Sequence, residues 1–156
     1  MLRRGAKRYG SGHRTGDARR GGAAILALRG DLGAGKTTFV QGFFRGLGLR
    51  RRAPSPTFII MRRHALGARR PPAARARRGI SRRPQFSNVF HVDAYRLKGA
   101  KPLAALGFKG VLSDPRNIVL IEWADRVRGI VPKGALWLAF GHGKNAAERS
   151  ILIARK

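Results

Sequence analysis

Apolar residues along the chain follow two patterns: short continuous runs and one helical repeat. The run at 24–28 predicts a short buried strand, and the longer run at 118–123 predicts a central strand buried on both faces. Between these runs, apolar residues from 39 to 47 recur at the spacing of one helix face, and Gly48 supplies a stop. The first part of the chain therefore predicts a strand, a glycine-rich turn and a helix.

Other segments also predict strands, with shorter or more polar patterns. Residues 88–95 alternate, so that His91 and Asp93 lie on the face opposite to Val92. Leucines within 103–112 predict a short helix and a turn before the central strand. Further strands are predicted at 57–61, 135–140 and 150–154.

The glycine-rich turn after the first strand carries the most specific chemistry. It fits the phosphate-binding pattern G-x-x-x-x-G-K-[ST], and its glycines let backbone N–H groups point inward. The helix that starts near Lys36 directs the positive end of its dipole to the same place. Lys36 can reach the β- and γ-phosphates, and the Thr37 hydroxyl can bind Mg²⁺. The predicted nucleotide-binding residues are Gly30, Asp31, Leu32, Gly33, Ala34, Gly35, Lys36, Thr37 and Thr38.

This order of elements predicts the fold class. A strand, a phosphate-binding turn and a helix, followed by further strands, are typical of an α/β protein of the P-loop NTPase kind. We expect a single domain in which a central mixed sheet, mainly parallel, is flanked by helices.

Acidic residues are rare, and two of them end predicted strands. Glu122 closes the central apolar run and Asp93 closes the segment 88–95. P-loop enzymes use a carboxylate at the end of a neighbouring strand to hold Mg²⁺ or to orient the attacking water. We therefore predict Lys36, Asp93 and Glu122 as catalytic residues and Thr37, Asp93 and Glu122 as metal ligands. The alternatives are an ordinary strand-terminal acid at Glu122 and an arginine-paired edge acid at Asp93.

Three other residues have two interpretations each. His91 is more typical of a packed or solvated strand histidine than of a catalytic base. Trp123 fits the hydrophobic core, the usual place of a tryptophan after a buried strand, or a position beside the nucleotide. Thr57 follows two prolines and either senses the γ-phosphate as a switch residue does or caps a strand.

Length and composition indicate one domain. The chain has 156 residues, of which 43% are apolar. We expect a basic disordered tail at 1–21 and a domain at 22–156 with a flexible basic insert at 62–85, rich in Arg, Ala, Pro and Gly. The sequence has no cysteine and no apolar run long enough to span a bilayer, and its start lacks the apolar core of a secretory signal. These features predict a cytoplasmic protein without a membrane partner.

The charge is strongly positive. Lys and Arg total 34 against 7 Asp and Glu, which gives a formal net charge of +27. Such a surface attracts polyanions, so RNA contact is one expectation. The alternative is that the arginines simply lie in solvated loops.

Four motifs in one order resemble the TsaE family, also called YjeE, small bacterial ATPases required for tRNA threonylcarbamoyladenosine synthesis. The resemblance runs from about Gly22 to the C-terminus, with 62–85 outside it. Leu106-Gly107 and Arg149 also fit. The motifs are Gly30–Phe39, Ser55–Phe58, His91–Leu97 and Ile121–Trp123.

The resemblance implies functional roles for these motifs. Lys36 and the loop amides would hold the ATP phosphates, with Thr37 on Mg²⁺ and Thr57 in a switch-like segment. Asp93 and Glu122 would bind the metal and orient the hydrolytic water, and Trp123 would lie beside the nucleotide.

The resemblance also implies partners. The protein would bind the TsaD–TsaB pair, which transfers threonylcarbamoyl to adenosine 37 of tRNAs, and ATP hydrolysis would reset that complex between turnovers. The ATPase would be weak alone and active with these partners. Contact with tRNA would be indirect or through the basic tail and insert.

Two other functions agree with parts of the sequence. The first is a small-molecule or nucleotide kinase built on the same loop, although the basic insert shows no ordered lid pattern. The second is a basic nucleic-acid-binding protein with a vestigial P-loop, although the aromatic residues are not interleaved with the arginines.

Overall fold

The computed structural model describes residues 21–49, 59–66, 86–145 and 148–155. The expectations for the tail at 1–20, for Thr57 and for the insert from residue 67 to 85 lie outside these residues. Within the described residues, no helix combines the length and the apolar character needed to cross a bilayer.

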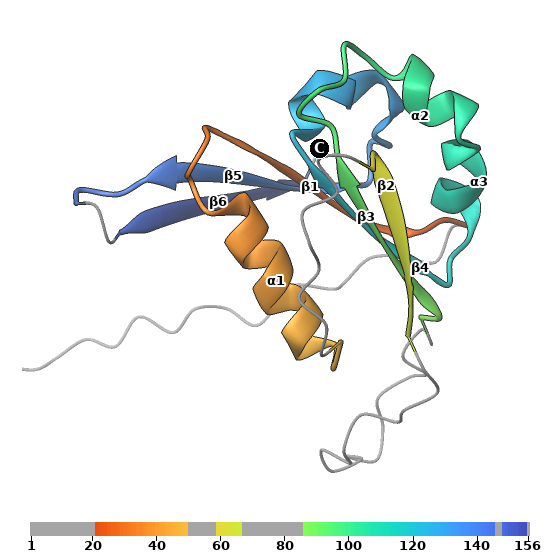
Figure 1. Cartoon of the computed structure of the whole chain (residues 1–156), viewed down its shortest axis with the longest axis horizontal. Helices are drawn as coiled ribbons and strands as arrows, with labels where there is room; N and C mark the ends of the chain where they lie inside the picture. The colour runs from red at the N-terminus through yellow and green to blue at the C-terminus, as the bar shows by residue number, and fades with distance from the viewer. Residues whose placement is uncertain (1–20, 50–58, 67–85, 146–147, 156) are drawn as a thin grey trace, which may run out of the picture.

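In the described part of the chain, six strands form one mixed sheet in the order β2-β3-β4-β1-β5-β6 (Figure 1). The four inner strands are parallel to one another, while β2 and β6 pair antiparallel at the two edges. The mainly parallel sheet with helices confirms the predicted fold class. The strands are β1 (Ala24–Gly30), β2 (Met61–Ala65), β3 (Asn88–Asp93), β4 (Asn117–Glu122), β5 (Leu136–His142) and β6 (Arg149–Arg155).

The strand β4 is buried along its whole length because helices cover both faces of the sheet. This confirms the prediction of a central strand from its apolar run. β1 lies between β4 and β5, and in the register of the sheet Leu28 of β1 is opposite Glu122 of β4. The carboxyl ends of β1, β3 and β4 therefore meet at one edge of the sheet.

Among the described residues, one helix covers one face of the sheet, and three shorter helices cover the other (Figure 1). Val40 and Phe44 of α1 (Lys36–Gly46) pack against Leu28 and Leu120 of the sheet. The opposite face packs against Phe108 and residues of its neighbouring helices. These helices are α2 (Lys101–Ala105), α3 (Phe108–Ser113) and the 3₁₀ helix η2 (Ala124–Ile130).

The second strand differs from the prediction. A strand was predicted at 57–61, but β2 occupies Met61–Ala65, so residues 62–65 belong to the sheet and not to a flexible insert. Because β2 is an edge strand, it can carry Arg62 and Arg63 without burying either charge on both sides. The sequence of β2 has no apolar period because this edge strand carries two arginines.

The connection before β4 also differs in detail. Where one short helix was predicted, α2 and α3 are separated by Gly107, whose φ of 70° places it in the left-handed region. The helix η2 was not predicted, and Val127 interrupts it with non-helical dihedral angles.

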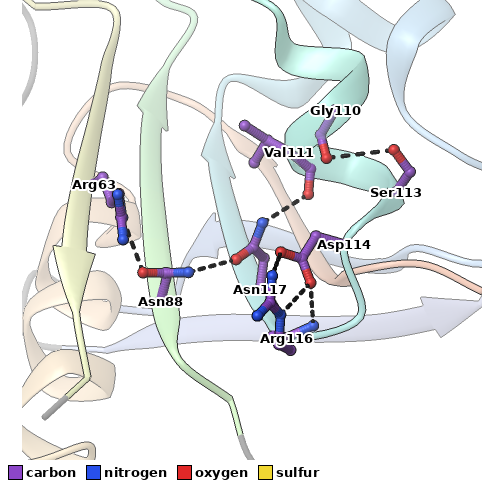
Figure 2. A network of polar contacts seen from close by, with 8 residues as sticks. All are labelled: Arg63, Asn88, Gly110, Val111, Ser113, Asp114, Arg116 and Asn117. Atoms are coloured by element: carbon purple, nitrogen blue, oxygen red, sulfur yellow. Dashed lines mark hydrogen bonds and ion pairs between the residues drawn. The ribbon is translucent and has the colours of Figure 1, made fainter.

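A polar network connects β2, β3 and β4 to α3 at the amino ends of β3 and β4 (Figure 2). The Asn88 side chain accepts from Arg63 Nε at 2.9 Å and donates to Asn117 Oδ1 at 2.9 Å. Asn117, which is buried, donates in turn to the Val111 carbonyl at 3.1 Å. This network stabilises the edge of the sheet opposite to the phosphate-binding turn.

Candidate functional site

The phosphate-binding turn connects β1 directly to α1. Gly30 ends β1 with a φ of 134°, and a Cβ there would overlap the Phe140 carbonyl oxygen of β5. Gly35 precedes α1 with a φ of 98°, and no side chain of the described residues caps the helix. The N–H groups of the first turn are therefore available to an anionic ligand, as the motif predicts.

Lys36 is buried beneath its own loop. Its Nζ donates to the Gly30 carbonyl at 2.7 Å and to the Asp31 carbonyl at 2.8 Å, and it lies 3.8 Å from the centre of the Trp123 ring. Burial lowers the pKa of Lys36 from its ordinary value, and Glu122 is the strongest of the nearby carboxylates that oppose this shift. A phosphate that replaced these carbonyls would give the buried cation an anionic partner.

Glu122 lies at the end of β4 and contacts two other elements. Its Oε2 accepts the Thr37 hydroxyl of α1 at 2.7 Å, and its Oε1 lies 2.8 Å from His91 Nε2 of β3. The exposed fractions are 2% for Glu122 and 1% for His91, so both side chains are largely shielded from bulk water. The carboxylate is thus held between the first turn of the helix and the neighbouring strand.

Asp93 lies directly opposite Glu122 in the register of β3 and β4. Its Oδ1 accepts the backbone N–H of Tyr95 at 2.9 Å, which fixes the start of the following turn. Because strand side chains alternate between faces, Asp93 and Glu122 extend from the same face of the sheet, toward the loop. Both carboxylates act to raise the pKa of Lys36 against the larger effect of burial, in agreement with this proximity.

A pocket of about 160 Å³ opens between the loop and the end of β4. Half-buried Trp123 forms one side of the pocket. Its φ is 57°, and no other non-glycine residue of the described chain has a positive φ. Beyond the pocket, its ring packs 5.0 Å from that of Tyr95, and Arg126 lies over both rings. The pocket is lined by Leu32, Gly33, Gly35, Lys36, Thr37, Thr38, Glu122 and Trp123.

The residues near the pocket fit Mg²⁺, which retains several waters and takes few protein ligands. The Thr37 hydroxyl gives its hydrogen to Glu122, so its oxygen lone pairs remain available to a cation. Among the described residues, no three His, Cys, Asp or Glu side chains form a closed metal cage. The Thr37 hydroxyl and the Glu122 carboxylate line the pocket and suit an ion that is also bound by phosphate oxygens, whereas Asp93 lies beside Glu122 but does not line the pocket.

Most of the residues predicted for the site lie together. Gly30 and Asp31 do not line the pocket, but their carbonyls hold Lys36. Ala34 is fully buried in the core below the loop. Trp123 contacts the core and also lines the pocket.

Two residues outside the predicted set contact the site. Arg149, at the start of β6, donates from Nε to the Gly33 carbonyl at 3.2 Å and supports the outer side of the loop. His91 is buried against Glu122 and not solvated. The sequence signal for His91 was its place two residues before Asp93 in the predicted strand, because alternate strand residues share a face.

Comparison with known proteins gives one consistent family. The sequence model described as "Threonylcarbamoyl adenosine biosynthesis protein TsaE" matches residues 4–151. The tRNA threonylcarbamoyladenosine biosynthesis protein TsaE of Haemophilus influenzae is 29% identical over 111 residues, covering 71% of this chain and 58% of the relative. The protein of the same name from Streptomyces coelicolor is 36% identical over 102 residues, covering 65% of this chain and 57% of the relative.

A solved structure has a similar fold. The crystal structure of Bacillus subtilis YdiB aligns with a TM-score of 0.56 at 27% identity, and the alignment covers 84% of this chain and 67% of that one. The chain spans less than two thirds of the length of the Haemophilus and Streptomyces relatives.

Proposed function

The chain belongs to the TsaE family, and on this premise we propose that it binds and hydrolyses ATP in tRNA N6-threonylcarbamoyladenosine modification at position 37. The relatives from Haemophilus and Streptomyces are threonylcarbamoyladenosine biosynthesis proteins by name, which supports this pathway. The observation that carries the proposal is the hydrogen bond between Thr37 and Glu122 beside buried Lys36.

The mechanism rests on position and charge. The loop N–H groups and Lys36 bind the phosphates, and the charge of Lys36 stabilises the negative charge that develops during phosphoryl transfer. Asp93 and Glu122 orient the attacking water from the end of the sheet. Thr37, Asp93 and Glu122 are the residues that would hold Mg²⁺, which neutralises phosphate charge when it is bound.

Trp123 couples the phosphate site to the next segment of the chain. Its ring centre lies 3.8 Å from Lys36 Nζ. A phosphate that draws Lys36 away from the Gly30 and Asp31 carbonyls also changes this contact. Because η2 follows Trp123 directly, nucleotide binding has a direct route to the surface formed by η2.

The proposed partners are the TsaD and TsaB proteins, whose complex would be reset by ATP hydrolysis between turnovers. In this arrangement the isolated subunit hydrolyses ATP slowly and becomes active with its partners. Contact with tRNA is indirect or involves the basic segments. A cytoplasmic location agrees with these partners.

The test is ATP binding with Mg²⁺ and hydrolysis, each measured for the wild type, Lys36→Ala and Glu122→Ala. We expect Lys36→Ala to abolish binding, because it removes the buried cation of the loop. We expect Glu122→Ala to bind ATP but to lose turnover. Lys133→Ala is the matched control, since Lys133 is exposed between η2 and β5. Equal ATP binding by all four proteins would refute the site.

Two further assays on the same proteins separate the two alternatives. Transfer of the γ-phosphate to an added acceptor instead of water would indicate a kinase. Binding to RNA that falls steeply with salt and is unchanged in Lys36→Ala would indicate a basic nucleic-acid-binding protein. Neither outcome is expected.

A further inference from the structure

Among the described residues, Glu122 is the single polar contact of the His91 side chain. The ring is 1% exposed, and its Nε2 lies 2.8 Å from Glu122 Oε1. Its other nitrogen, Nδ1, is buried and has no hydrogen-bond partner among the described residues. A carboxylate can only accept hydrogen bonds, so His91 carries its hydrogen on Nε2 and donates it to Glu122.

Packing alone does not account for a histidine at this position. The ring meets Phe44 of α1 edge to face, with centroids 5.7 Å apart, and Val89 on the same strand face lies in the same apolar cluster. A phenylalanine would make similar contacts without leaving a buried nitrogen unpaired, which is a costly arrangement for a polar atom. The specific property of histidine here is the Nε2–H group directed at Glu122.

The two contacts of Glu122 together fix the direction of its carboxylate. Thr37 holds Oε2 from the helix, and His91 holds Oε1 from β3. Without His91, only the bond to Thr37 would remain among these contacts, and the carboxylate would gain rotational freedom about its own bonds. The entry of phosphates and a cation into the pocket can alter the Thr37 bond, because Thr37 lines the pocket.

We propose that His91 is a positioning residue for ATP hydrolysis, acting through the carboxylate of Glu122. This inference rests on the proposed ATPase function. His91 touches neither the pocket nor the phosphate loop, so its loss should slow the chemical step and leave ATP binding almost unchanged. Changes to a partner that orients a functional ligand typically cost about 10–100-fold in activity, and we expect a decrease of that size in kcat with KM within about twofold.

The first test compares four full-length variants in single-turnover hydrolysis of ATP and in titrations with a fluorescent ATP analogue. His91→Phe keeps the ring and removes the donor, and we expect it to be slow. His91→Gln places an amide N–H near the position of Nε2 and should recover most of the rate. His91→Asn places its amide near the position of Nδ1, which does not face Glu122, and should remain slow.

His64→Phe is the matched control. His64 lies on β2, packs on the same Phe44 ring at 4.9 Å, and also has a buried ring nitrogen with no hydrogen-bond partner among the residues that the structure describes. It makes no contact with Glu122, so His64→Phe should hydrolyse ATP at the wild-type rate at neutral pH. A similar rate loss in His64→Phe and His91→Phe would show that only the packing around Phe44 matters and would overturn the inference.

The second test is a double-mutant cycle with Glu122→Gln. If His91 acts through Glu122, adding His91→Phe to Glu122→Gln should cause no further decrease in kcat. A further decrease equal to that of His91→Phe alone would contradict the inference. If His91→Phe proves unfolded in a thermal melt, the rates of His91→Gln and His91→Asn decide, since an equal rate for both variants refutes the role of the Nε2–H group.

A readout that does not depend on activity completes the experiment. In ¹⁵N-labelled protein without nucleotide, the His91 Nε2–H proton should exchange slowly with water and should be lost from the spectrum in Glu122→Ala. A fast-exchanging proton in the wild type would overturn the inference. A wild type that neither binds nor hydrolyses ATP would overturn the ATPase function as well, whereas an active wild type matched by His91→Phe would overturn only the role of His91.

Discussion

Substitution of Gly30 by alanine tests the close approach of β1 to β5 where the phosphate-binding turn begins. The residue has a φ of 134°, a conformation that residues with a side chain rarely adopt. An added Cβ would overlap the Phe140 carbonyl oxygen and lie 3.0 Å from its carbonyl carbon. Both atoms are backbone atoms of a paired strand, so neither can move without disturbing the sheet.

Two costs determine the expected loss of stability. Strained backbone at a residue with a side chain costs about 1–3 kcal/mol, and forcing atoms into a packed region costs about 1–3 kcal/mol more. The sum is roughly 4 kcal/mol, a large part of the roughly 5–15 kcal/mol that stabilises a typical domain. At about 2–4 °C per kcal/mol for a domain near this size, we expect Gly30→Ala to lower Tm by about 8–16 °C.

Two other glycines separate these costs in the same thermal melts. Gly35 has a φ of 98°, but its added Cβ would lie 3.8 Å from the nearest atom, so Gly35→Ala should lose only the strain component. Gly42 lies within α1, and an added Cβ there would lie 3.9 Å from its nearest atom, at the end of the Arg45 side chain. Gly42→Ala should therefore raise Tm slightly, because alanine favours helices. Equal Tm values for Gly30→Ala and Gly35→Ala would refute the close approach of the two strands.

The remaining predictions concern pH and the polar network. Burial, with added effects of His91 and Arg62, lowers the pKa of His64, so its contribution to stability is fully present above its ordinary pKa of about 6.5 and is lost as pH falls. Thermal melts at pH 7.5 and pH 5 should therefore show a smaller loss of Tm in His64→Phe than in the wild type, and equal losses would contradict the shift. Asn117→Ala removes two hydrogen bonds of a buried side chain and should cost about 2–3 kcal/mol in urea unfolding. ATP affinity should not change in this variant, because the network lies at the opposite edge of the sheet, and a weakened affinity would refute that separation.

The sequence predicted the inner strands well because their apolar runs reflect burial on both faces. β4 follows from its continuous run, and β1 follows from the run before the glycine-rich turn. The second strand was predicted at 57–61 instead of Met61–Ala65, because an edge strand with two arginines has no apolar period. The helix η2 was missed because it is short and interrupted at Val127, so it has no sustained helical repeat.

The candidate site was predictable where a motif fixes the backbone and less so where distant side chains meet. The loop residues follow from the local pattern, and Glu122 follows from its place after a buried run. The contact of Glu122 with both Thr37 and His91 depends on the order of strands in the sheet, which no local pattern contains. His91 therefore looked like an ordinary strand histidine in the sequence.

The position of β1 between β4 and β5 has a consequence for synthesis on the ribosome. β1 and the phosphate-binding turn emerge early, but both neighbours of β1 are encoded much later in the chain. Pairings between such distant segments form slowly. A nascent chain that stops before residue 122 thus carries the complete glycine motif but lacks the carboxylate that faces it. The nascent chain should therefore retain nucleotide only late in translation. Nucleotide retention would then report that the sheet around β1 has formed.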